Sequence, residues 1–105
     1  RTVARFGIAG ERKQGWTGAW TAGGSRKLAS IGVAVKRWVT LHGFALNVST
    51  ELSRFAAINP CGLEATIMGS LQSVLDRPVA VSDVKSVATA EMGAVFGRVF
   101  TSAAA

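Results

Sequence analysis

The chain has 105 residues and carries twelve Lys and Arg against six Asp and Glu, which gives a formal net charge of +6 at pH 7. This length suits one small domain, and no apolar run approaches the roughly 18–20 residues of a transmembrane helix. One cysteine excludes an internal disulfide, and Glu11, Arg12 and Lys13 interrupt any signal-peptide core. We therefore expect a cytosolic protein in a reducing compartment.

The N-terminal quarter of the chain predicts a helix end followed by a short strand. Residues 1–8 read as the last turns of a helix, because Val3 and Phe6 share one face and Gly7 can form a left-handed cap. Residues 9–15 are polar and predict a loop. A short strand is expected over residues 18–21, followed by a turn at the Gly-Gly pair of residues 23–24.

A hairpin is predicted next, over residues 27–48. Residues 27–35 place small or apolar side chains on both faces, which predicts a strand that is covered on both sides. Residues 38–48 alternate in the same way and predict a second, antiparallel strand. The pair Lys36-Arg37 is the expected tight connection between them.

Helical segments are expected in the C-terminal half. Residues 49–59 carry helix-compatible residues with an N-cap candidate at Ser49 or Thr50, and Pro60 ends any helix there. Two further helices are predicted from apolar stripes, the second with Ser82 as N-cap. The first stripe is Ile67, Leu71, Val74 and Leu75, and the second is Val84, Val87 or Ala88, Met92, Val95 and Val99.

The basic charge leaves two interpretations open. The basic residues form scattered pairs, at 12–13, 26–27 and 36–37, and no aromatic residues interleave with them as stacking platforms would. A small basic nucleic-acid binder is therefore an alternative that we rank low. A basic surface also favours acidic protein partners, and a solvated basic face is an equally simple interpretation of any one pair.

The segment Pro60-Cys61-Gly62 is the candidate centre of chemistry. A free cysteine is usually a small buried hydrophobe. A Pro-Cys-Gly turn instead exposes the sulfur and can direct backbone N–H groups toward it, which suits a nucleophile. Lys27 could supply a positive charge that favours the thiolate, although a lysine at the start of a strand is most often solvated. The sequence separates the two residues by 34 positions, so only the tertiary fold can join them.

Several segments together resemble the lipoyl(octanoyl) transferase family. The match runs through Trp16-Thr17-Gly18-Ala19-Trp20, Arg26 to Gly32, Arg37 to Thr40, His42 to Val48 and Ile58 to Gly62. The resemblance implies an α/β fold, a mixed sheet that forms part of the biotin/lipoate protein ligase-like catalytic domain. Family members are about twice this long, within the range of one larger domain. Their Arg-Gly-Gly and His-Gly-Pro-Gly-Gln segments do not occur here, so we expect residues 1–105 to be the C-terminal half of one octanoyltransferase catalytic domain.

The resemblance also implies roles for individual residues. Cys61 is the expected acyl-thioester nucleophile and Lys27 the residue that activates it, whereas His42 is expected to position groups or line the pocket. The segments that line the acyl site in the family match Ser30, Ile31, Gly32, Gly43, Phe44 and Ala45. We expect the Lys27 ammonium and the Cys61 sulfur within roughly 6 Å of each other. The two should open onto a groove lined by Gly32 and Gly43.

The expected reaction is octanoyl transfer from octanoyl-acyl carrier protein to a lipoyl-domain lysine in protein lipoylation. The resemblance implies lipoyl domains of 2-oxoacid dehydrogenases and the glycine cleavage H protein as acceptors, with no nucleic acid and no membrane as partner. No cofactor or metal is expected, because one Cys and one His cannot fill a tetrahedral site and no phosphate-binding loop of Gly-x4-Gly-Lys type occurs. An inactive fragment or interaction module stays open as an alternative. Because half of the domain is expected to be absent, we also expect partly exposed apolar strand faces at Ile31, Val33, Val35 and Phe44.

Overall fold

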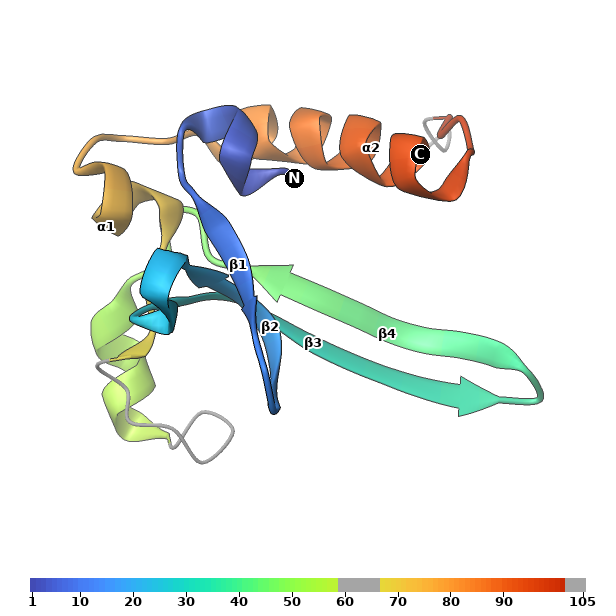
Figure 1. Cartoon of the computed structure of the whole chain (residues 1–105), viewed down its shortest axis with the longest axis horizontal. Coiled ribbons are helices and arrows are strands. Elements are labelled where there is room, and N and C mark those ends of the chain that lie inside the picture. The colour runs from blue at the N-terminus through green and yellow to red at the C-terminus, as the bar shows by residue number, and fades with distance from the viewer. Residues whose placement is uncertain (59–66, 102–105) are drawn as a thin grey trace.

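The computed structural model describes residues 1–58 and 67–101, and its centre is one antiparallel sheet in the order β1-β2-β3-β4. Figure 1 shows most of the helical segments near one end of this sheet, whereas the last helix, drawn in orange, extends along one side of it. The expected α/β class is confirmed. The strands are β1 (Gly10–Lys13), β2 (Trp16–Thr21), β3 (Lys27–Lys36) and β4 (Val39–Leu46); the helical segments are the 3-10 helices η1 (Val3–Phe6), η2 (Ala22–Gly24) and η3 (Leu52–Ala57) and the α-helices α1 (Leu71–Leu75) and α2 (Val81–Phe96).

In the N-terminal part of the chain, the predicted helix end and the predicted strand are confirmed, but the predicted loop between them is wrong. Gly7 caps η1 in the left-handed region at φ 87°, and the predicted strand is present and longer than expected, as β2. The predicted loop at residues 9–15 instead contains β1, which pairs with β2 through Gly10↔Thr21 and Glu11↔Trp20. The residues of β1 are polar because this edge strand is largely exposed, so its burial pattern carries no apolar alternation that a sequence reading could detect.

The predicted hairpin is confirmed as β3 and β4, which pair without interruption from Ala29↔Leu46 to Lys36↔Val39. The connecting residues are Arg37 and Trp38, at φ 51° and 63°, one position later than expected. Two consecutive residues with positive φ are typical of the two-residue turns that match the twist of antiparallel strands. Neither Arg37 nor Trp38 is a glycine, so this turn adopts its conformation at a steric cost.

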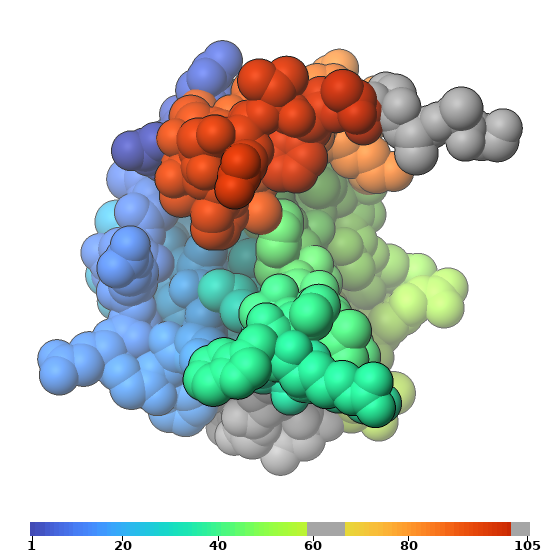
Figure 2. All heavy atoms as spheres, turned by 90° about the vertical axis from the view of Figure 1, so that its right-hand side faces the viewer, coloured from blue at the N-terminus to red at the C-terminus, as the bar shows by residue number. Residues whose placement is uncertain are grey.

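The outer part of the hairpin is a two-stranded ribbon that extends away from the rest of the molecule (Figure 1). The expectation that β3 is covered on both sides holds only for Lys27, Leu28 and Ala29, and it is wrong from Ile31 onward. Figure 2 views the molecule with this ribbon toward the reader. The apolar residues that were expected to be left open are about half exposed: Ile31 50%, Val33 55%, Val35 62% and Phe44 53%.

The hydrophobic core lies at the other end of the hairpin, where the helical segments meet the sheet. Leu28 and Leu71 are fully buried and pack with Val48 and Val84. Val3, Ile8 and Val79 complete this cluster, and Phe6, Leu46 and Leu75 pack against its edge. The apolar residues of η1, β3, α1 and α2 therefore share one core.

Helices form in the three regions where the second half of the chain predicts them, but helix type and N-cap residues differ from the prediction. The segment after β4 forms the 3-10 helix η3, whose N-cap is Glu51 and not Ser49 or Thr50. Helix α1 begins at an N-cap Ser70 that forms a reciprocal capping box with Ser73. Helix α2 begins after Ala80, so Ser82 lies inside its first turn and is not the cap. No helix in the described part of the chain is both long enough and apolar enough to cross a membrane.

Residues 67–70 are fixed between the start of β3 and the end of β4. The Gly69 N–H donates to the Lys27 carbonyl at 2.9 Å, and Lys27 and Met68 form a parallel bridge. On the other side, the buried Asn47 donates from Nδ2 to the Gly69 carbonyl at 3.1 Å, and the Leu71 N–H donates to the Asn47 carbonyl at 3.0 Å. We call this arrangement the Lys27–Gly69–Asn47 clamp. It fixes the point at which the chain returns to the sheet after residues 59–66.

We predict that Asn47→Ala lowers the free energy of unfolding by about 1–3 kcal/mol, because it leaves the buried Gly69 carbonyl without its donor. Thr50→Ala is the matched control, since it removes only the Thr50 hydroxyl bond to Asn47 Oδ1 at 3.3 Å from an exposed residue. Chemical denaturation of both variants checks the difference. Equal stabilities of the two variants would show that the clamp contributes nothing.

We also predict that this chain alone is marginally stable or self-associates through the ribbon. Each large apolar side chain left in water forgoes roughly 1.5–3 kcal/mol, and a domain has only about 5–15 kcal/mol in total. Replacing Ile31, Val33 and Val35 together by Thr keeps the β-branched shape, so it should shift the chain toward monomer in size-exclusion chromatography. A wild-type chain that elutes as a single monomer peak and melts sharply at high temperature would contradict this prediction.

Candidate functional site

Cys61, the expected nucleophile, lies outside the described residues together with its neighbours Pro60 and Gly62. Its expected distance from Lys27 therefore stays a prediction. The described residues do include Lys27, His42 and the six expected substrate-binding residues. They also include Met68 and Gly69, the point at which the chain rejoins the sheet seven residues after Cys61.

Lys27 is the first residue of β3, and only 2% of it is exposed. The interpretation of Lys27 as an ordinary solvated lysine is therefore wrong, whereas its neighbour Arg26 is exposed. A fully buried lysine is rare unless it is paired. Within residues 1–58 and 67–101, the ion pairs are Arg5–Glu91 and Arg54–Glu51, and neither involves Lys27. Its ammonium is thus buried without a carboxylate from the described part of the chain.

An irregularity between β2 and β3 sets the direction of the Lys27 side chain. The two strands pair through Ala19↔Ala29 and then Trp20↔Lys27, so the register shifts by one residue between these pairs. Without this bulge, Trp20 would face Leu28. Directly opposed residues on antiparallel strands place their side chains on the same face, so the bulge brings the lysine onto the indole. The Lys27 Nζ lies 5.9 Å from the centroid of the Trp20 ring.

The ring of Trp20 lies close to two lysine ammonium groups. It is fully buried, and a second ammonium, that of Lys13, lies 4.5 Å from its ring centroid. The Lys13 Nζ also donates to the Gly24 carbonyl at 3.4 Å. The Trp20 Nε1 atom is buried and has no hydrogen-bond partner among the described residues.

Gly18 leaves the space that the Lys27 side chain occupies. A Cβ at this position would collide with the Ala29 carbonyl oxygen and would come within 3.0 Å of Lys27 Cε. Its φ of 115° is also a conformation that residues with a side chain rarely adopt. Strand β2 therefore needs a glycine where the lysine crosses it.

The six expected substrate-binding residues form one block of the β3–β4 ladder. Three consecutive cross-strand pairs contain all of them: Ser30↔Ala45, Ile31↔Phe44 and Gly32↔Gly43. His42 pairs with Val33 at the next position, is exposed, and has an unusual φ of 71°. Gly32 lies five residues from Lys27, or roughly 16 Å along an extended strand. The block and the lysine thus share a strand but occupy different parts of it.

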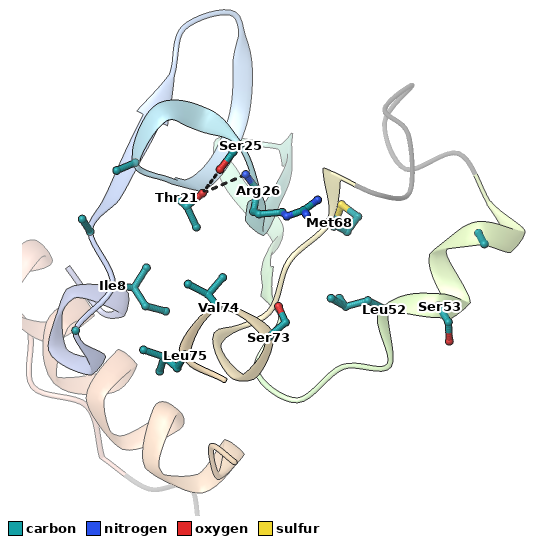
Figure 3. Close-up of a pocket in the computed structure, with 14 residues that line it drawn as sticks. Ile8, Thr21, Ser25, Arg26, Leu52, Ser53, Met68, Ser73, Val74 and Leu75 are labelled. Carbon is teal, nitrogen blue, oxygen red and sulfur yellow. Dashed lines mark hydrogen bonds between the residues drawn. The ribbon is translucent and has the colours of Figure 1, made fainter. Parts of the chain in front are cut away.

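A pocket of about 910 Å³ lies beside the start of β3. Figure 3 shows its polar side, where the Thr21 hydroxyl accepts from the Arg26 N–H at 3.1 Å and pairs with the Ser25 hydroxyl at 3.1 Å. Ile8, Leu52, Met68, Val74 and Leu75 supply its apolar lining. Arg26, which precedes Lys27 in the chain, and Met68, the bridge partner of Lys27, thus both border this space. In the described ranges, no three His, Cys, Asp or Glu residues are grouped so that they could hold a metal ion.

The sequence predicted no role for Trp20, whose ring centroid lies 5.9 Å from the Lys27 Nζ, or for Gly18, which leaves space for the Lys27 side chain. Both lie within Trp16-Thr17-Gly18-Ala19-Trp20, a segment that carries part of the family resemblance. The alternation in β2 could have placed Trp20 on one face of the sheet, but the sequence contains no signal for the bulge that aligns Trp20 with Lys27. The Asn47 side chain satisfies a backbone group, because its Nδ2 donates to the Gly69 carbonyl.

Comparison with known proteins shows similarity along most of the chain. Residues 1–93 match the model of the lipoyl protein ligase A/B catalytic domain. The chain is 58% identical over 83 residues to a protein named octanoyltransferase from Geobacter metallireducens, a match that covers 79% of this chain and 38% of that protein. It is 47% identical over 95 residues to an octanoyltransferase from Gloeobacter violaceus, covering 90% of this chain and 41% of that protein.

A longer match extends almost to both ends of the chain. It is with an octanoyltransferase from Maridesulfovibrio salexigens, at 41% identity over 104 residues, and it covers 99% of this chain and 46% of that protein. The chain thus spans less than half the length of these curated relatives. The extent of the family match and the identities to these relatives together show that the chain belongs to the lipoyl protein ligase A/B catalytic domain family.

Proposed function

We propose that this chain takes part in octanoyl transfer in protein lipoylation, with Cys61 as the acyl carrier and Lys27 as the group that activates it. Relatives that share half or more of the matched residues are named octanoyltransferase, which supports the reaction class. The observation that carries the residue assignment is the burial of Lys27 next to the clamp. This lysine is held, without a carboxylate from the described residues, on the backbone that receives the chain after Cys61.

The clamp supports a short distance between the two residues. Cys61 precedes Met68 by seven residues, so the reach of an extended chain limits their Cα atoms to at most about 25 Å. The Lys27 carbonyl accepts from the Gly69 N–H, which places the far end of this stretch directly on the lysine. An ammonium near the sulfur would favour the thiolate form of Cys61.

The proposed reaction has two steps of acyl exchange. In the first, the Cys61 thiolate attacks the thioester carbonyl of octanoyl-acyl carrier protein; a new carbon–sulfur bond forms, the carrier's carbon–sulfur bond breaks, and the carrier's sulfur leaves as a thiolate that takes a proton from the Lys27 ammonium. In the second, the amine of a lipoyl-domain lysine attacks the Cys61 thioester; an amide bond forms, the carbon–sulfur bond breaks, and a proton leaves the nitrogen. Lys27 holds and returns these protons and stabilises the thiolate between the steps.

The acyl acceptors and the six residues of the β3–β4 ladder also have roles in the proposed reaction. The acceptors are lipoyl domains of 2-oxoacid dehydrogenases and the glycine cleavage H protein, and the reaction takes place in the cytosol. Small residues at Gly32 and Gly43 would let an acyl chain pass close to the ribbon backbone, with Ile31 and Phe44 as its apolar contacts. The net charge of +6 would favour acidic partners.

The first test is the acidity of the only thiol in the chain. We predict that iodoacetamide labels Cys61 with a pH midpoint below the value of about 8.5 for a free thiol, because Lys27 stabilises the thiolate. Lys27→Ala should raise the midpoint, whereas Lys36→Ala, on the exposed ribbon, should leave it unchanged. A midpoint near the free-thiol value in wild type and in Lys27→Ala would disprove the pairing.

The second test is formation of the intermediate. Incubation with octanoyl-loaded acyl carrier protein should add one octanoyl group to the intact mass, and Cys61→Ser should abolish this adduct or convert it to a more slowly formed ester. Because the chain spans less than half the length of its relatives, we expect a lower rate than theirs. An absent adduct would favour an inactive fragment or interaction module, and salt-sensitive DNA binding in that case would favour the nucleic-acid alternative.

A further inference from the structure

We propose that Trp20 is a positioning residue that holds the Lys27 ammonium through its indole face. The proposal rests on the function proposed above, in which Lys27 acts on Cys61. It goes further because it assigns the direction of the lysine to a residue on a different strand. The lysine has no carboxylate partner among the described residues, so the ring is its identified electrostatic contact there.

The first line of support is the geometry of the two strands. The register shift after Ala19↔Ala29 makes Trp20 and Lys27 direct partners, and the Nζ–centroid distance of 5.9 Å lies at the outer limit of a cation–π contact. Gly18 is the second part of this arrangement. It removes the side chain that would otherwise obstruct the lysine stem at Cε. The register shift between β2 and β3 and the glycine at position 18 thus both favour the contact between Lys27 and Trp20.

The second line of support is the chemistry of the residue at position 20. The Trp20 Nε1 is buried and lacks a hydrogen-bond partner among the described residues, which is a cost that a phenyl ring in the same place would avoid. An indole, however, attracts cations more strongly than a phenyl ring does. The presence of two ammonium groups at this ring, from Lys13 and Lys27, agrees with such a role.

The contact has a consequence for Cys61. An ammonium held on a fixed ring face loses few alternative rotamers when a thiolate forms, whereas an unrestrained lysine stem has many. Removal of the indole should therefore weaken the effect of Lys27 on the thiol without removing the charge itself. Loss of the indole should therefore shift the pH midpoint of Cys61 labelling. It should leave the maximum labelling rate at high pH unchanged, because that rate reports how exposed the sulfur is.

The experiment compares iodoacetamide labelling of Cys61 against pH in wild type, Trp20→Leu, Trp20→Phe and Lys27→Ala. Trp20→Leu should label roughly 3- to 10-fold more slowly than wild type at pH 7, which is a midpoint shift of roughly 0.5–1 unit upward, with an unchanged maximum rate. Trp20→Phe should lie between Trp20→Leu and wild type. Trp16→Leu is the matched control, since Trp16 lies on the same strand, is 44% exposed and has a ring contact to Lys13 but not to Lys27.

The outcomes separate this proposal from the function on which it rests. If Lys27→Ala leaves the midpoint unchanged, the Lys27–Cys61 pairing fails and the role of Trp20 fails with it. If Lys27→Ala raises the midpoint and Trp20→Leu does not, only the positioning role is overturned. A Trp20→Leu variant that raises only the maximum rate reports looser packing and also overturns it. If Trp20→Leu does not fold, Trp20→Phe decides, because an unchanged profile in that variant contradicts the proposal.

Discussion

The backbone pairing between Lys27 and the segment Met68–Gly69 is the constraint on which the rest of this structure depends. One parallel bridge and the bond from the Gly69 N–H to the Lys27 carbonyl hold the chain against the sheet where it returns after residues 59–66. Asn47 fixes the same segment from the other strand of the hairpin. The core built from Leu28, Val48 and Leu71 lies immediately around this junction, so apolar burial and backbone pairing support the same point.

This junction also explains why a lysine can be buried in so small a protein. The side chain of Lys27 lies beside the neighbouring strand β2, where Gly18 provides space and Trp20 provides a polarisable surface. The Lys27 carbonyl accepts from the Gly69 N–H and its backbone forms a parallel bridge with Met68, so the residue cannot move outward without breaking these contacts. The position of the ammonium is therefore determined by the fold and not by a flexible surface rotamer, as a catalytic group requires.

The sequence predicted those features that depend on local signals. Gly7 as a helix cap and the β3–β4 hairpin follow from residues that are neighbours in the chain or alternate along it. The exposed faces at Ile31, Val33, Val35 and Phe44 do not follow from this alternation, which predicted coverage on both sides; they were expected only because the family resemblance implied half of a domain. Strand β1 was missed because its polar residues form a strand only through pairing with the adjacent strand β2, an interaction that overrides composition. The motif register supplied the candidate Lys27, but neither its burial nor its contact with Trp20 could be predicted, because both depend on a one-residue bulge. The block of six ladder residues follows directly from the hairpin register, so correct strand pairing was enough to bring them together.

The central claim, that the clamp brings Lys27 and Cys61 together, is tested most directly by a short-spacer reagent that first alkylates a thiol and then acylates a nearby amine. Cys61 offers the only thiol, while Lys13, Lys27, Lys36 and Lys85 compete for the second reaction. Peptide mapping by mass spectrometry then identifies the linked lysine. We expect the Cys61–Lys27 link to dominate in the wild-type chain and to fall in Asn47→Ala, where the clamp is weakened. Fully alkylated Cys61 that is linked to Lys13, Lys36 or Lys85 and never to Lys27 would contradict it.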